Sequence, residues 1–454
     1  MLSPAGKQFQ GEDQRAPLRE ALKRHGQLQA GQTAGRLYPM ACVSLEITQR
    51  CNLDCTLCYL SDRAEMAKDV PLEILRQRID MIHGHYGPGT SIQISGGDPT
   101  LRKIEDLEAL CRHIRSLGMR SCMMTNGIKA TREMLARLSK AGLDDLALHV
   151  DLTQERKGFE TEESLNVVRA EYIERAKGLG LRVLFNTTVY DGNIAELPVM
   201  ARFFREHADA ISLTSFQMQA DTGRGVLRDR DDGITQASVM AALSDGMGLP
   251  LDFDVTSVGH SLCNRYTSVL AAGGVVISPL TNRKLVEDAI AALETMDKRE
   301  SGYLDVLRLL GRLAFRHPGL GARLVAEAGR WLWRLRGGLW QSRGKVHRMS
   351  ILVHNFMDAK KLDRERCESC VFMVATENGP LSMCVHNAER DAHIFAPSKV
   401  ETPQGPRWWD AENGFGDVLP QPANATGEPS MPLKRLKGRM KAKAMLERKS
   451  GGQR

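Results

Sequence analysis

Six stretches typical of β-strands alternate with stretches typical of helices between residues 41 and 216, and this alternation constrains the fold more than any other feature. Repeated strand–helix units predict a parallel sheet covered by helices. Periodicity alone leaves open whether the sheet is flat and open or curved into a partial barrel. The expected strands are residues 43–48, 91–95, 120–125, 145–150, 182–189 and 211–216, and the expected helices are residues 72–85, 101–117, 132–141, 162–179 and 194–207.

A loop directly after the first expected strand carries three cysteines, Cys51, Cys55 and Cys58. A 4Fe–4S cluster takes four ligands, so three thiolates leave one iron with an open position. Open positions are where metal sites carry out chemistry. The alternative is structural zinc, which needs a fourth ligand nearby, whereas the next cysteine, Cys111, lies in an expected helix. The spacing therefore favours a reactive iron–sulfur cluster.

The residues around these cysteines resemble the radical S-adenosylmethionine (SAM) superfamily. Tyr59 follows the third cysteine, and Ser95-Gly-Gly-Asp-Pro-Thr100 looks like the glycine-rich SAM-binding motif of that family. Thr125-Asn-Gly127 looks like a third family element, and the family usually carries Glu where this chain has Asp98. Glycines lack a Cβ atom, so the backbone of such a motif can approach a ligand closely.

The resemblance implies a partial (β/α)6 barrel in which the three cysteines hold a SAM-binding 4Fe–4S cluster. It also implies that an electron, from a flavodoxin- or ferredoxin-type donor, cleaves SAM to a 5′-deoxyadenosyl radical that attacks an unactivated carbon. These motifs all follow strand ends, where parallel sheets bind ligands, so we expect them to converge. The residues expected to contact SAM are Tyr59, Gly96, Gly97, Asp98 and Asn126.

The fourth and fifth expected strands carry polar residues on one side. His149 and Asp151 share one side of the fourth strand, and Asn186 and Thr188 share one side of the fifth. They are either polar groups satisfied within the core or contacts to SAM or substrate.

Four more cysteines follow the expected barrel. A C-x2-C pair with two outlying cysteines is a complete set of four thiolates, compatible with zinc or with a closed 4Fe–4S cluster. The first cysteine motif favours a second 4Fe–4S cluster. The expected ligands are Cys263, Cys367, Cys370 and Cys384, whereas Cys42, Cys111 and Cys122 are expected to be buried apolar residues.

The blocks Gly259–Cys263, Val353–Ala359 and Asn378-Gly379 resemble one branch of the radical SAM superfamily. That branch holds tetraether lipid synthase and a related dihydropterin methyltransferase, and it joins or methylates unactivated carbons. Residues expected either to line the substrate cavity or to fold the loop of the second cluster are His354, Asn355 and Asp358.

The net charge of +7 is concentrated at the C-terminus. Residues 433–454 contain nine Lys or Arg and one Glu, so the remaining residues sum to about −1. This distribution argues against a nucleic-acid-binding core. The start of the chain lacks the apolar core of a secretory signal, and the clustered cysteines indicate metal in a reducing compartment. We therefore expect a cytoplasmic protein, with peripheral contact at the inner membrane face as a further option.

A helix is expected at about residues 320–340, with an apolar stripe flanked by arginines. Such a helix either lies on an anionic membrane surface or packs on the barrel. The stripe comprises Leu324, Ala328, Trp331, Leu335 and Leu339, flanked by Arg323, Arg330, Arg334 and Arg336. If this helix lies on a membrane, it favours, together with the basic tail, a lipid substrate over a pterin.

The expected organisation is an N-terminal extension (1–40), the barrel (41–250), a C-terminal auxiliary-cluster region (251–400) and a flexible basic tail (401–454). The leading hypothesis is a radical SAM enzyme that forms carbon–carbon bonds or methylates lipid chains. Alternatives are a radical SAM maturase of a peptide, an enzyme acting on a pterin-like small molecule, and a zinc-stabilised nucleic-acid-binding protein without enzymatic activity.

Overall fold

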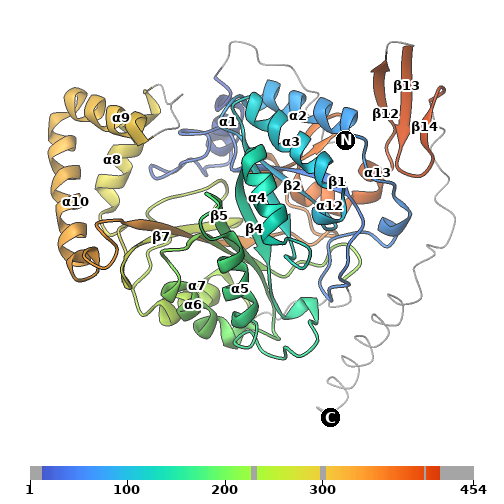
Figure 1. Ribbon diagram of the computed structural model, residues 1–454. Helices are drawn as coiled ribbons and strands as arrows, with labels where there is room; N and C mark the ends of the chain where they lie inside the picture. The colour runs from blue at the N-terminus through green and yellow to red at the C-terminus, as the bar shows by residue number, and fades with distance from the viewer. Residues whose placement is uncertain (1–12, 226–232, 297–302, 403–404, 420–454) are drawn as a thin grey trace.

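The computed structural model describes residues 13–225, 233–296, 303–402 and 405–419 (Figure 1). The first residues of the expected N-terminal extension and the basic segment at 433–454 lie outside these ranges.

The main sheet confirms the expected parallel arrangement. Its six central strands pair side by side in sequence order, and every neighbouring pair is parallel. The two edges of the sheet do not pair with each other in the described part of the chain, so the barrel is partial, as predicted. The central strands are β1 Cys42–Thr48, β2 Ser91–Gly96, β3 Arg120–Thr125, β4 Leu143–His149, β5 Arg182–Val189 and β6 Ile211–Met218.

Helices connect these strands at the expected positions. In α4, the side chain of Thr131 caps the first turn by accepting from the amide of Met134, and Gly142 ends the helix in the left-handed conformation. Leu135 and Leu138 of α4 are buried against the sheet, as their spacing indicates. The connecting helices are α2 Leu72–Tyr86, α3 Ile104–Ser116, α4 Arg132–Ala141, α5 Asn166–Ala176 and α6 Leu197–Glu206, and α7 Gln236–Met247 follows β6.

The helix expected at residues 162–179 begins later in the structure, because the residues at its expected start form hydrogen bonds to other segments. The Glu162 carboxylate is buried and bonds to Arg169, to the side-chain amide of Asn193 and to the amide of Leu152. A charged group without water needs such partners, and α5 begins only at Asn166.

Strands from the C-terminal part of the chain extend both edges of the sheet. Strand β9 (His347–Asn355) pairs parallel to β6, and β10 (Phe372–Thr376) pairs parallel to β1. Strands β7 and β8 form an antiparallel hairpin that lies beyond β9. The residues that carry the second cysteine set are thereby placed against the barrel. The other edge strands are β7 Asn264–Ala272, β8 Val275–Ile277 and β11 Gly379–Ser382.

A helical lobe lies between β8 and β9 in sequence and stands at one side of the molecule (Figure 1). The expected helix is α10, and its predicted stripe is covered. Leu335 is fully buried against Ala272 and Ile277 of the hairpin, while Leu324 packs in the cluster between α8 and α9. The stripe is therefore a packing surface, and its assignment to a membrane surface is wrong. The lobe comprises α8 Arg283–Glu294, α9 Tyr303–Arg316 and α10 Pro318–Leu339.

A small antiparallel sheet lies at the other side of the molecule (Figure 1). It occupies residues predicted to begin the flexible tail, so that prediction is wrong as far as residue 416, where Trp409 is buried among apolar residues. None of the helices in the described ranges has the length and apolar character to cross a bilayer. The remaining elements are α1 Ala16–Arg24, α11 Arg364–Glu368, α12 Met383–Ala388, α13 Arg390–Ile394, β12 Ser398–Thr402, β13 Gly405–Asp410 and β14 Gly414–Gly416.

Candidate functional site

The three cysteines of the first motif lie together in the loop that follows β1. Burial raises the pKa of the Cys55 thiol well above its ordinary value, and the neighbouring Cys58 and Cys51 raise it further. The loop is held from outside by backbone hydrogen bonds, because the amide of Gly225 donates to the Cys58 carbonyl at 3.1 Å and the amide of Thr56 donates to the Thr153 carbonyl at 2.8 Å. Three thiols are thus gathered in a loop whose backbone is fixed.

The Gly96-Gly97 turn at the end of β2 lies directly against the backbone that leads into the cysteine loop. The amide of Gly97 donates to the Thr48 carbonyl, and the amide of Asp98 donates to the Arg50 carbonyl, both at 2.8 Å. A Cβ atom on either glycine would collide with one of these carbonyl oxygens. The two glycines therefore allow their turn to pack closely against the backbone before the cysteine loop. The sequence predicts in addition that they allow the backbone to approach a ligand closely.

Asp98 joins the second turn to the third. Its carboxylate is fully buried and accepts hydrogen bonds from the Thr100 amide and hydroxyl, the Thr125 hydroxyl and the Asn126 amide, at 2.5–3.0 Å. A carboxylate with this many donors is satisfied without a ligand. In this chain the shortened acid positions the turns after β2 and β3.

Tyr59 and Asn126 complete the set predicted to contact SAM. The Tyr59 hydroxyl donates to the Gly96 carbonyl at 2.5 Å, and the Asn126 side-chain amide donates to Asn52 of the cysteine loop at 2.7 Å. The structure therefore brings all five of the predicted residues to the carboxyl edge of the first three strands, beside the cysteine loop.

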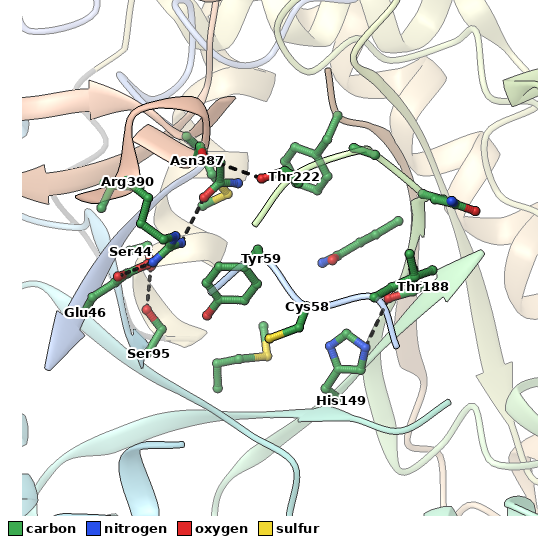
Figure 2. Close-up of a pocket in the computed structure, with 18 of the residues that line it drawn as sticks. Ser44, Glu46, Cys58, Tyr59, Ser95, His149, Thr188, Thr222, Asn387 and Arg390 are labelled. Carbon is green, nitrogen blue, oxygen red and sulfur yellow. Dashed lines mark hydrogen bonds and ion pairs between the residues drawn. The ribbon is translucent and has the colours of Figure 1, made fainter. Parts of the chain in front are cut away.

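A cavity of about 160 Å³ lies between the cysteine loop and the sheet (Figure 2). Figure 2 shows Cys58 and Tyr59 near its centre, with His149 and Thr188 on one side and Glu46 and Arg390 on the other. Apolar side chains make up much of the remaining wall. They are Leu57, Met124, Met218, Phe356, Val374 and Met383.

The sequence model of the radical SAM superfamily matches residues 45–204. This range includes the cysteine loop, both turns and the strands that position them. The chain contains a radical SAM domain. It is a radical SAM enzyme and uses a 4Fe–4S cluster and SAM, as the sequence predicts. The non-enzymatic, zinc-stabilised alternative is wrong.

Relatives of the radical SAM enzyme differ in how much of it they match. It is 28% identical over 388 residues to the 7,8-dihydro-6-hydroxymethylpterin dimethyltransferase of Methanocaldococcus jannaschii, covering 76% of both chains. It is 28% identical over 186 residues to the Fe-coproporphyrin III synthase of Methanosarcina barkeri, covering 39% of this chain and 44% of that one. It is 31% identical over 172 residues to the PqqA peptide cyclase of Xanthomonas euvesicatoria pv. vesicatoria, covering 36% and 43%.

Solved structures with partial similarity include Streptococcus suis SuiB bound to S-adenosylmethionine, with 16% identity, a TM-score of 0.34 and coverage of 46% of this chain and 48% of that chain. Native anSMEcpe with bound AdoMet gives 17% identity and a TM-score of 0.34, with coverage of 45% and 59%.

The residues present fit the cluster that the radical SAM domain uses. A cluster held by thiolates carries negative charge, and the buried Arg224 lies beside Cys58, with its guanidinium 3.0 Å from Glu65 and 3.8 Å from Asp54. Burial lowers the pKa of Arg224, but the Cys58 thiol and these acids raise it by more, so its cationic form is favoured. Sequence analysis missed Arg224, because nothing in its local sequence links residue 224 to the cysteine loop.

No three His, Cys, Asp or Glu side chains among the described residues are arranged to hold a single metal ion. In a 4Fe–4S cluster the thiolates bind different irons, so they need not converge on one point.

His149 and Asp151 meet as their alternation along the strand predicts. His149 Nε2 lies 2.6 Å from Asp151, whose carboxylate also accepts from the Thr188 amide at 2.7 Å and from the Thr153 amide and hydroxyl. Burial raises the pKa of Asp151, but His149 and these donors lower it to about 2, so the acid is ionised. Burial lowers the pKa of His149, and the facing carboxylate raises it by more. Asp151 therefore fixes the imidazole at the edge of the cavity.

A buried ion pair that sequence analysis missed forms the opposite wall. Arg390 of α13 donates to both carboxylate oxygens of Glu46 on β1, at 2.8 and 2.6 Å, and to the side-chain oxygen of Asn387 at 2.9 Å. Its guanidinium lies 4.5 Å from the centre of the Tyr59 ring (Figure 2). Glu46 was detectable as the acid within an apolar strand, whereas Arg390 had no distinguishing signal.

The second cysteine set gathers around another cavity, next to β9 and β10. Cys263, Cys370 and Cys384 line it. Burial raises the pKa of Cys367 to about 11, with further increases from Cys370 and Cys263, so the fourth thiol lies close to the others. Arg366 donates to the Cys263 sulfur at 3.2 Å, which supplies a cation next to the set. Four thiols with a neighbouring cation fit a closed cluster.

The residues predicted as substrate-cavity candidates lie elsewhere. His354 and Asn355 line the cavity of the second cysteine set, where His354 bonds to Asn264 at 2.7 Å, and Asp358 accepts from the amide of Asp221 at 2.8 Å. None of the three lines the barrel cavity. His354 and Asn355 lie where the alternative prediction, folding the loop of the second cluster, places them, whereas Asp358 contacts the segment after β6. Phe356, two residues after His354, lines both cavities and forms the wall between them.

Proposed function

We propose that this radical SAM enzyme functionalises an unactivated carbon of a lipid chain, by carbon–carbon bond formation or by methylation. The observation that carries the proposal is the cavity beside Cys58, because much of its wall is apolar and suits an alkyl chain. Similarity to a dimethyltransferase over 76% of both chains supports chemistry of this class.

In this proposal Cys51, Cys55 and Cys58 hold the first cluster. The turns at Gly96-Gly97 and Asn126, with Tyr59, receive SAM. When bound, cluster and SAM together supply a 5′-deoxyadenosyl radical that removes a hydrogen atom from the substrate. The protein orients the substrate carbon in the cavity and keeps water away from it.

His149 and Arg390 orient the substrate from opposite walls. Because Asp151 is ionised and accepts from Nε2 of His149, that nitrogen keeps its proton. The same carboxylate raises the pKa of His149, which favours the imidazolium, so its Nδ1–H donates a hydrogen bond to the substrate. Arg390 forms an ion pair with Glu46, so its guanidinium shapes the cavity wall and its charge is already balanced.

Cys263, Cys367, Cys370 and Cys384 hold a second 4Fe–4S cluster in this proposal. Anaerobic reconstitution should give about eight irons per chain, and about four after Cys370→Ser with Cys384→Ser. Cys111→Ser is the matched control, because that buried thiol lies in α3, outside both sets, and should leave the iron count unchanged. Iron and sulfide analysis measures this, and zinc in place of the missing iron would contradict the assignment.

The proposed organisation keeps residues 41–250 as the radical SAM barrel and residues 251–400 as the auxiliary region, whose strands extend the same sheet. The enzyme acts in the cytoplasm, at the inner face of the membrane. A flavodoxin- or ferredoxin-type protein supplies the electron.

A pterin-like small molecule is the second candidate substrate, favoured by the similarity to the 7,8-dihydro-6-hydroxymethylpterin dimethyltransferase of Methanocaldococcus jannaschii. Amide side chains in the cavity, Gln93 and Gln217, suit the edge of a heterocycle. A peptide is the third candidate, since the peptide cyclase matches 36% of this chain.

The lipid proposal predicts a changed lipid extract when the gene is present. Mass spectrometry of extracts from cells with the gene, without it, and with the three cysteines of the first motif replaced should show new or methylated alkyl species only in the first. An unchanged profile would contradict the lipid substrate. Purified enzyme would then be assayed for 5′-deoxyadenosine release stimulated by a pterin or by a peptide.

A further inference from the structure

Helix α10 has a second apolar face, which none of the described residues cover. Val325, Leu332, Trp333 and Trp340 are 73%, 49%, 67% and 92% exposed. Positions spaced by seven or eight residues lie two turns apart on the same side of a helix, so these four form one face. We call these four residues the outer face of α10. Large apolar side chains gathered on an exposed surface mark an interaction site.

The outer face points away from the body of the protein. Residue 335 lies about 80° round the helix from residue 325, about 60° from residue 332 and about 140° from Trp340, and Leu335 is fully buried on the hairpin. Figure 1 shows α10 at the outer edge of the lobe, with the hairpin strand β7 on its inner side. The buried stripe therefore anchors α10 and holds its outer face toward the surroundings.

Most of the charge near this face is positive, although Arg323 is paired with Asp288 of α8. Residues 308–345 contain nine Lys or Arg and a single acid, Glu327. Glu327 is buried and is bonded to Arg330 and to the Trp331 ring nitrogen, so it offers little negative charge to a partner. The guanidinium of Arg336 lies 4.2 Å from the centre of the Trp333 ring. Cations and tryptophans thus share one surface.

We propose that the outer face of α10 docks this enzyme on an anionic lipid surface. Apolar and tryptophan side chains enter the headgroup boundary, and the surrounding arginines attract acidic headgroups. A second copy of the chain fits less well, because a symmetric contact would place Arg336, which lies over the Trp333 ring, against its own copy. The docking does not depend on the chemistry in the barrel, so an enzyme acting on a pterin would still bind vesicles.

Vesicle sedimentation of the full-length protein tests the docking face. The wild-type protein should bind vesicles that contain both phosphatidylglycerol and phosphatidylcholine. It should bind much more weakly to vesicles of phosphatidylcholine alone. Trp333→Ala with Trp340→Ala should weaken binding at least about tenfold, from the loss of two inserted rings. Val167→Ser is the matched control, because Val167 is 70% exposed on α5, outside the lobe, and should leave binding unchanged.

Emission from the tryptophans gives a second readout that separates α10 from the basic C-terminal segment. Vesicles with brominated acyl chains should quench wild-type emission, and the double variant should lose most of that quenching. Unaltered binding and quenching in the double variant would overturn the proposal. So would a dimer in light scattering that the double variant converts to a monomer, without any vesicle binding, since that assigns the face to a second copy.

Discussion

Replacing Cys51, Cys55 and Cys58 together by alanine should abolish SAM cleavage and remove the first cluster. These three thiols supply the ligands that one loop offers, and alanine cannot bind iron. Without the cluster no electron reaches SAM, so 5′-deoxyadenosine formation should fall to the level of the reaction without enzyme. Chromatography of the reaction products measures this nucleoside, and iron analysis should show a loss of about four irons per chain.

The matched control for the triple variant is Cys111→Ala. Cys111 is buried in α3 and removed from the cysteine loop, so its loss should leave SAM cleavage and iron content near wild type. Circular dichroism of each variant checks that the sheet still forms. Continued 5′-deoxyadenosine formation by the triple variant would refute the assignment of the first cluster to this loop.

Local signals explain why much of the barrel was predictable from the sequence. The expected bounds of α4 and β5 agree with the structure at both ends. Thr131 caps α4 and Gly142 ends it, so the residues at its two ends predict its limits. The edges of the sheet were not predictable in this way. Strand β9 pairs with β6 across more than a hundred residues of intervening chain, and no local pattern specifies that partner.

Part of the candidate site was also predictable from the sequence, and part was not. The cysteine loop and the turns at Gly96-Gly97 and Asn126 each follow a strand end, so parallel topology alone predicts that they meet. The contact between Glu46 and Arg390 joins residues 344 positions apart. Such a pair depends on where α13 docks on β1, which the sequence of neither segment encodes.

Helix α10 shows what periodicity leaves undecided. Its sequence has apolar residues on more than one side, and a spacing pattern does not say which side the protein covers. The structure buries the stripe that contains Leu335 and exposes the one that contains Trp333. The inference of membrane contact therefore moves to a different face of the same helix.

Breaking the pair of Glu46 and Arg390 should destabilise the protein strongly. Both side chains are buried, so Arg390→Met leaves the Glu46 carboxylate without water and without its cation. Removing one partner of a buried pair typically costs about 3–5 kcal/mol of unfolding free energy. Urea unfolding measures the loss. Arg137→Met is the matched surface control, since Arg137 pairs with Glu105 and Glu108 at the exposed surface and its loss should cost much less than that of Arg390.

The pH dependence of this loss identifies its electrostatic cause. Burial raises the pKa of Glu46, but Arg390 and other partners lower it to about 2 from an ordinary value of 4.5. In wild type the ionised pair therefore stabilises the fold above about pH 4.5, and this stabilisation is lost as the pH falls toward 2. In Arg390→Met, burial without the cation should raise the pKa of Glu46, so protonation relieves the penalty. The difference in unfolding free energy should be largest near pH 7, begin to shrink as the pH falls through the raised pKa of Glu46 in the variant, and shrink further between pH 4.5 and 2 as the wild-type pair is lost. Adding Glu46→Gln should recover part of the loss at pH 7, and a loss that stayed constant with pH would show that packing by the arginine stem is responsible.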